Sequence, residues 1–176
     1  MNSEVTNHKI AIVLAMHGSP PKDFPKKELA EFFNLHQRLE YMPQSMDEAS
    51  KQKCQELEEK MKSWPRTKYN DPFFSSSYEL AAYINKSTGF EVCVGFNEFC
   101  NPSLRDALEE VIKTNPQKII VITTMMTPGG EHAEIDIPMI IAEVQKQYPT
   151  IPIKYAWPFK FEDVTDFLHA QIKKYL

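Results

Sequence analysis

Residues 9–16 read KIAIVLAM, and the turn-forming residues HGSPP follow at once, at 17–21. A short, nearly continuous apolar run that ends in a turn is typical of a strand buried on both faces of a parallel sheet. Three similar runs occur later, at residues 90–96 (FEVCVGF), 118–125 (KIIVITTM) and 151–157 (IPIKYAW). The sequence therefore predicts four strands, the first of which ends directly before His17.

Helical patterns separate the later strands. Apolar residues recur at helical spacing within residues 104–112, 140–148 and 164–172. Asn101 followed by Pro102, and Asp136 followed closely by Pro138, are residue types that favour helix starts. The alternation of strands and helices predicts an α/β fold, in which helices cover both faces of a parallel sheet to give three α/β/α layers.

The segment between the first two strands is too long for a simple crossover. It predicts several helices, including one that carries His36 on an apolar face and a short one that starts near Ser76. We expect one domain over residues 1–176, with a helical insertion after the first strand at about residues 25–75. An apolar helix face favours a buried core role for His36, and a position over a functional site is the alternative.

Composition limits the classes of partner. The formal net charge is -4 and no basic cluster is interleaved with aromatic residues, which argues against nucleic acid. No apolar run approaches the ~20 residues of a membrane-spanning helix, and the first residues lack the features of a signal peptide. Cys54, Cys93 and Cys100 form no pair with metal-ligand spacing, which fits small apolar residues in a reducing cytoplasm.

Residues with metal-binding or proton-accepting side chains follow three of the predicted strands. His17 follows the first strand, Glu98 the second, and Glu131, His132, Glu134 and Asp136 follow a Gly-Gly turn after the third. Ligands of parallel α/β sheets bind at the carboxyl ends of the strands, so these side chains are expected at one rim. Imidazole binds transition metals and accepts protons near neutral pH. The alternative is that each histidine only stabilises its loop by hydrogen bonding.

Several enzyme classes lack their signatures here. The chain has no phosphate-binding loop, no G-x-G-x-x-G after a strand and no G-x-S-x-G nucleophile turn. A histidine phosphatase also has His-Gly after its first strand, but it carries Arg directly before that histidine. Met16 stands at that position.

Three stretches resemble, in order, the motifs of one known family. They are HGS at residues 17–19, FNEFCNPSL at 96–104 and GGEHAEIDIP at 129–138. In this order and at these strand ends, the chain resembles the small sirohydrochlorin cobaltochelatases of the class II tetrapyrrole chelatases. The resemblance covers roughly residues 9–20 and 88–176, and much of the segment between them has no counterpart.

The resemblance implies that His17 and His132 bind the incoming metal and that Glu98 is a further catalytic carboxylate. It implies ATP-independent insertion of a divalent ion into sirohydrochlorin, with Co²⁺ expected and Ni²⁺ or Fe²⁺ as alternatives, and no cofactor beyond the substrate ion. It also implies a homodimer. Lys22, Lys26 and Lys27 are candidates to meet the carboxylates of the substrate. The alternatives are a carrier that binds metal or tetrapyrrole without catalysis, and a degenerate chelatase-fold protein with a structural role.

Overall fold

The computed structural model describes residues 10–176. Its four strands form one sheet in the order β2–β1–β3–β4, and every neighbouring pair is parallel. The strands are β1 (Ile10–Met16), β2 (Glu91–Phe96), β3 (Lys118–Thr123) and β4 (Ile153–Tyr155). The predicted α/β class is therefore confirmed. Lys9, the first residue of the predicted first strand, lies outside the described residues.

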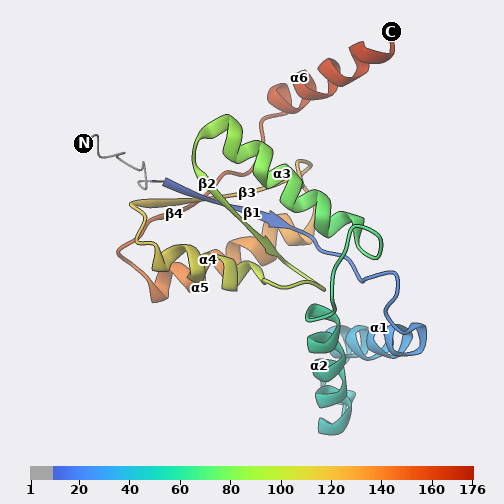
Figure 1. Cartoon of the computed structure of the whole chain (residues 1–176). Helices are drawn as coiled ribbons and strands as arrows, with labels where there is room; N and C mark the ends of the chain where they lie inside the picture. Colours follow the sequence, from blue (N-terminus) through green and yellow to red (C-terminus); the bar gives the residue numbers. More distant parts are fainter. Residues whose placement is uncertain (1–9) are drawn as a thin grey trace.

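Helices cover both faces of the sheet and make the three predicted layers (Figure 1). Helices α4 (Leu104–Lys113) and α5 (Ile137–Gln147) pack on one face, where Val13, Val121 and Leu108 are fully buried. Helix α3 (Pro72–Thr88) packs on the other face, near Leu14 and other buried residues of β1 and β2. The continuous apolar run of β1 follows from this arrangement, because both of its faces are covered.

Two of the predicted helix starts are wrong, because a different residue caps the helix, and at a third, Asp136, the position is right but the side chain makes no cap. Ser103, and not Asn101, caps α4, since its hydroxyl accepts the N–H of Asp106 and the Asp106 carboxylate accepts the N–H of Ser103. Helix α3 begins at Pro72 under an Asp71 cap, earlier than the short helix expected near Ser76. Asp136 caps nothing, because the helix that precedes α5 already includes it.

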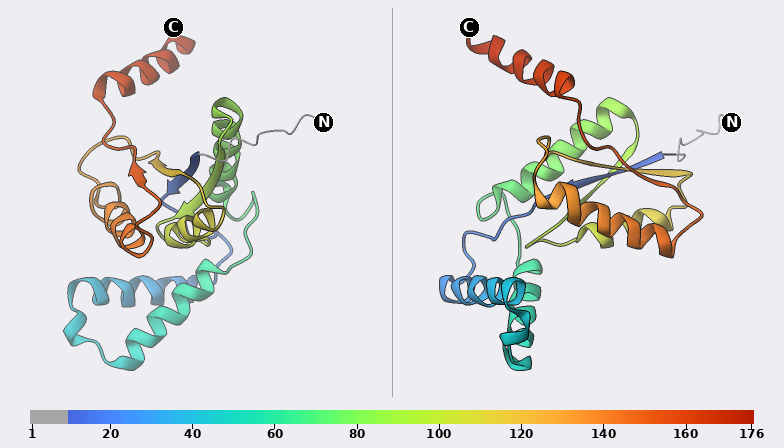
Figure 2. Two further views of the ribbon diagram at one scale, coloured as in Figure 1. Left: turned by 90° about the vertical axis from the view of Figure 1, so that its left-hand side faces the viewer. Right: turned by 180° about the vertical axis from the view of Figure 1, so that it is seen from behind.

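Two helices from the long connection pack on each other beyond the carboxyl end of β1. Helix α1 (Lys26–Tyr41) and helix α2 (Glu48–Lys62) bury a separate apolar cluster that includes Phe32, Leu35 and Leu57. Figure 2 shows this pair below the sheet and its flanking helices. That α1 and α2 are an insertion into a single domain remains a prediction.

The last helix, α6 (Phe161–Ile172), projects from the rest of the chain (Figure 1). None of its own residues is buried. Within residues 10–176, no helix combines the length and the apolar character that crossing a membrane would require.

Candidate metal centre

Three adjacent strands deliver the predicted site residues to one rim of the sheet. His17 directly follows β1, and Glu98 lies two residues beyond the end of β2. His132 begins the helical turn that follows β3. Because β2, β1 and β3 are neighbours and run in the same direction, their carboxyl ends meet. The topology thus accounts for the convergence of residues that are far apart in the sequence.

The three side chains form a compact group of potential metal ligands. One ligand atom from each of His17, Glu98 and His132 lies within 4.8 Å of the others, and all three residues are half-buried. Glu98 Oε2 is 3.8 Å from His17 Nε2 and 3.9 Å from His132 Nε2. The imidazole rings stand edge to face, with centroids 4.5 Å apart. Among residues 10–176, no other group of three or more His, Cys, Asp or Glu residues is arranged to hold an ion.

Hydrogen bonds at the far nitrogens orient both imidazoles. His17 Nδ1 lies 2.9 Å from the carbonyl oxygen of Gly18, and His132 Nδ1 lies 2.6 Å from Asp136 Oδ2. A carbonyl or carboxylate oxygen only accepts, so in neutral rings these contacts place the hydrogen on Nδ1. Each Nε2 then carries the lone pair that can bind a metal ion, and each lies within 4 Å of Glu98 Oε2. This pairing of a ligating imidazole with an outer oxygen is typical of metal sites in proteins.

A π-helical turn over His132–Asp136 presents His132 to the site. Such turns are rare and frequently occur at functional sites. The Tyr155 hydroxyl donates to the carbonyl oxygen of Ala133 at 3.1 Å, and burial raises the pKa of Tyr155 to about 12, so the donor stays protonated. The Glu134 carboxylate accepts the N–H of Gly129, which occupies it in the Gly-Gly turn. Asp136 makes no helix cap, and its carboxylate contacts His132, as expected for a carboxylate at this rim.

We expect Asp136→Asn to weaken Co²⁺ binding by about 10- to 100-fold, the usual effect of losing a partner of a ligating histidine. The amide keeps the size of the side chain but removes the negative charge that stabilises the Nδ1–H donor. Titration of Co²⁺ followed by visible absorbance measures the change. Asp163→Asn is the matched control, because Asp163 is exposed on α6. Equal affinities of the two variants would contradict the role given to Asp136.

A cavity of about 400 Å³ opens beside this group of ligands. Glu98, Glu131, His132 and Asp136 line it from the sheet side, and His36, Leu39 and Glu40 line it from α1. His36 is therefore not the buried core residue that its helix face favoured. It is half-buried, its ring stacks on Phe32, and it faces the same cavity as the candidate metal ligands. The three lysines considered for substrate carboxylates are exposed and absent from this lining.

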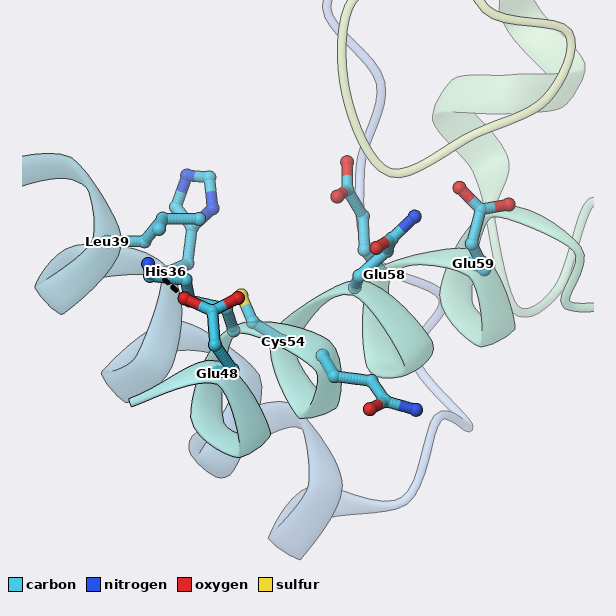
Figure 3. A pocket seen from close by; sticks show the side chains of 9 residues that line it. His36, Leu39, Glu48, Cys54, Glu58 and Glu59 are labelled. Atoms are coloured by element: carbon cyan, nitrogen blue, oxygen red, sulfur yellow. Dashed lines mark hydrogen bonds and ion pairs between the residues drawn. The ribbon is translucent and has the colours of Figure 1, made fainter. Parts of the chain in front are cut away.

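His36 and Leu39 also border a second hollow of about 520 Å³, between α1 and α2. Figure 3 shows His36 and Leu39 on α1, with Glu48, Glu58 and Glu59 extending from α2. Helix α1 thus divides this hollow from the cavity at the metal centre.

Sequence reasoning missed a buried ion pair close to the site. Arg66 and Asp71 lie between α2 and α3, and their side chains are 5% and 0% exposed. No local pattern marks these two residues, because their contacts are with loops that are distant in the sequence. All three cysteines are buried or half-buried, as expected for small apolar residues. Burial raises the pKa of the Cys100 thiol, which disfavours the metal-binding thiolate.

Part of the chain is similar to known proteins. A family model described as CbiX matches residues 73–175, a range that includes Glu98 and His132. A sirohydrochlorin ferrochelatase from Priestia megaterium is 28% identical over 85 residues, which are 48% of this chain and 31% of that protein. A sirohydrochlorin cobaltochelatase from Methanopyrus kandleri is 31% identical over 64 residues, which are 36% of this chain and 44% of that protein. The chain thus matches less than half the length of these curated relatives.

A solved structure shows the same fold. It is that of a CbiX protein assigned to cobalamin (vitamin B12) biosynthesis, from Marinobacter aquaeolei VT8. The alignment has a TM-score of 0.51 and 14% sequence identity, and it covers 94% of this chain and 98% of the other.

Proposed function

We propose, from the premise that this chain belongs to the CbiX family, that it inserts a divalent metal ion into a tetrapyrrole. The observation that carries the proposal is the convergence of two imidazole Nε2 atoms and one carboxylate within 4.8 Å, beside an open cavity. The substrate that we propose is sirohydrochlorin, which both curated relatives have in their names.

Metal insertion exchanges two pyrrole protons for one M²⁺ ion, which forms bonds to the ring nitrogens. His17 and His132 hold the incoming ion through Nε2, and three or fewer protein ligands leave coordination positions open for the ring. Glu98 is close enough to both imidazoles to complete the ligand set or to accept one pyrrole proton, and the remaining protons pass to water. The reaction needs no ATP, because strong bonds to the ring nitrogens replace weaker bonds to water and imidazole.

The donor set suits several first-row ions, since imidazole and carboxylate bind Co²⁺, Ni²⁺ and Fe²⁺ alike. The relatives differ in the same way, one being named a cobaltochelatase and the other a ferrochelatase. We propose Co²⁺ as the preferred ion, with Ni²⁺ and Fe²⁺ as alternatives. The protein requires no cofactor beyond this substrate ion, and its three free thiols fit a cytoplasmic location.

An absorbance assay tests the proposal. Purified protein is mixed with sirohydrochlorin and one of the three ions, without ATP and without oxygen, and each rate is compared with that of the uncatalysed reaction. Many turnovers per protein with at least one ion are expected. A single turnover per protein would identify a carrier instead. A rate equal to the uncatalysed one with every ion would refute metal insertion.

We further propose that the chain acts as a homodimer and that α6 takes part in the contact. Phe161, Phe167, Leu168 and Ile172 of this helix are 65%, 61%, 50% and 56% exposed, which leaves its apolar residues in water in the single chain. Apolar surface of this kind is typical of an association site.

Replacing both Phe167 and Leu168 by Glu is expected to convert a dimer into a monomer, because two charges would enter the apolar contact. Light scattering coupled to gel filtration measures the mass. The control replaces His169 and Gln171, polar residues of the same helix, by Glu. A monomeric unmodified chain would rule out the dimer, and a dimeric double variant would rule out the role of α6.

A further inference from the structure

The guanidinium of Arg66 joins four segments of the chain in a buried position. Nη1 donates to the carbonyl oxygen of Ser19 at 2.6 Å and to Asp71 Oδ2 at 2.5 Å. Nη2 donates to the carbonyl oxygen of Met61 at 2.8 Å and to that of Phe99. Arginine suits this position because its planar, rigid fork of donors can serve several acceptors at once.

Two of these carbonyl groups belong to the loops that carry the candidate metal ligands. Ser19 lies two residues after His17, and Phe99 directly follows Glu98. The same loops also contact each other, since the N–H of Glu98 donates to the carbonyl oxygen of His17 at 2.9 Å. Arg66 thus holds both loops at backbone positions that lie one or two residues after the candidate ligands.

Phe99 is held in a conformation that it would rarely adopt alone. Its φ is +59°, in the left-handed region that residues with a Cβ disfavour. The bond from Arg66 to its carbonyl oxygen stabilises this conformation. Phe99 also contacts helix α1 through Phe32 and Phe33, at ring-centroid distances of 6.3 and 6.0 Å. The direction in which the chain leaves Glu98 therefore depends on Arg66.

Asp71 extends the same arrangement to the loop after β1. Its Oδ2 atom accepts from Arg66, while its Oδ1 atom accepts the hydroxyl of Ser19 at 3.0 Å and the N–H of Phe74 at 2.9 Å. Ser19 is consequently fixed at both its carbonyl oxygen and its side chain. Asp71 also caps α3, so a rigid helix supports the pair.

We propose that Arg66 is a positioning residue for the metal centre, one that sets the separation of His17 and Glu98 without touching the ion. The inference rests on the proposed function, because it assumes that these residues bind metal. A purely structural role would lower the stability of the fold. A positioning role also changes the geometry of the bound ion in protein that remains folded.

The test compares Arg66→Lys with unmodified protein by Co²⁺ titration, at a temperature where circular dichroism shows both to be folded. Lysine keeps the charge beside Asp71 but offers a single nitrogen in place of the fork. We expect about 10- to 100-fold weaker binding, as for other changes to groups that orient metal ligands, together with a shifted visible spectrum of bound Co²⁺. Arg105→Lys is the control, since Arg105 is a partly exposed arginine that pairs with Glu109 and Glu143.

An unchanged affinity and spectrum in folded Arg66→Lys would overturn the inference. If Arg66→Lys does not fold, Ser19→Ala replaces it in the test, because this change removes only the hydroxyl bond to Asp71. We then expect a several-fold loss of Co²⁺ affinity and a shifted spectrum of the bound ion. Wild-type affinity and spectrum in Ser19→Ala would then overturn it. The proposed function fails separately, if unmodified protein binds no Co²⁺ or if His17→Ala binds it as tightly.

Discussion

Replacing His17 or His132 by Ala is expected to abolish Co²⁺ binding and metal insertion while the sheet stays folded. Each substitution removes one of three donors, so the loss should exceed the roughly 100-fold effect of removing a mere partner of a ligand. The side chains are half-buried, 42% and 24% exposed, and lie outside the apolar core, so each substitution should cost the roughly 1 kcal/mol of an average point mutation. The melting temperature should therefore fall by only about 2–4 °C.

Titration with Co²⁺ measures the loss of metal binding, and the sirohydrochlorin assay measures the loss of metal insertion. Thermal unfolding measures the stability. His169→Ala is the matched control, because this histidine is exposed on α6. Near-normal turnover in both site variants would count decisively against the assignment of the two imidazoles.

The second large effect is expected for Gly18→Ala. Gly18 has φ +97°, and a Cβ added there would lie 1.9 Å from the carbonyl oxygen of Glu98. The left-handed conformation costs a residue with a Cβ about 1–2 kcal/mol, and forced overpacking costs about 1–3 kcal/mol more. The free energy of unfolding should therefore fall by about 2–5 kcal/mol. The metal centre should also be distorted, since Gly18 directly follows His17 and packs against the carbonyl group of Glu98.

Gly129→Ala separates the two causes. Gly129 has nearly the same φ, +98°, but no atom lies within 4 Å of an added Cβ. The free energy of unfolding of Gly129→Ala should therefore fall by only about 1–2 kcal/mol. Urea unfolding gives both values by linear extrapolation. Equal decreases in the free energy of unfolding of Gly18→Ala and Gly129→Ala would show that the close contact with Glu98 contributes nothing to the effect.

The strands, and the strand-end positions of the candidate ligands, were predictable because both depend on local sequence. The apolar run before His17 predicts a strand buried on both faces, and parallel topology then brings strand ends together. Asp136 shows the limit of such reasoning. An Asp two residues before Pro138 is typical of a helix start, but the π-helical turn begins upstream and redirects the carboxylate to His132. The sequence thus placed Asp136 correctly among the carboxylates beside His132, but it did not show that the side chain leaves the helix end uncapped.

Residues whose contacts are distant in the sequence were not predictable. Arg66 follows a proline between two helices, and its charge alone indicates an exposed side chain. Its acceptors at Ser19 and Phe99 become neighbours only after the sheet and both connections have formed. The position of His36 was unpredictable for the same reason. The sequence identified its helix face correctly, but it could not show which surface lies opposite that face.

The lining of the cavity at the metal centre has an electrostatic consequence. Of the residues that line it, Glu40, Glu98, Glu131 and Asp136 are acidic and none is Lys or Arg. The resulting negative potential should speed the diffusional capture of cations and slow the approach of an anionic macrocycle. Ion and macrocycle are then expected to arrive by different routes, and added salt should slow the capture of the ion.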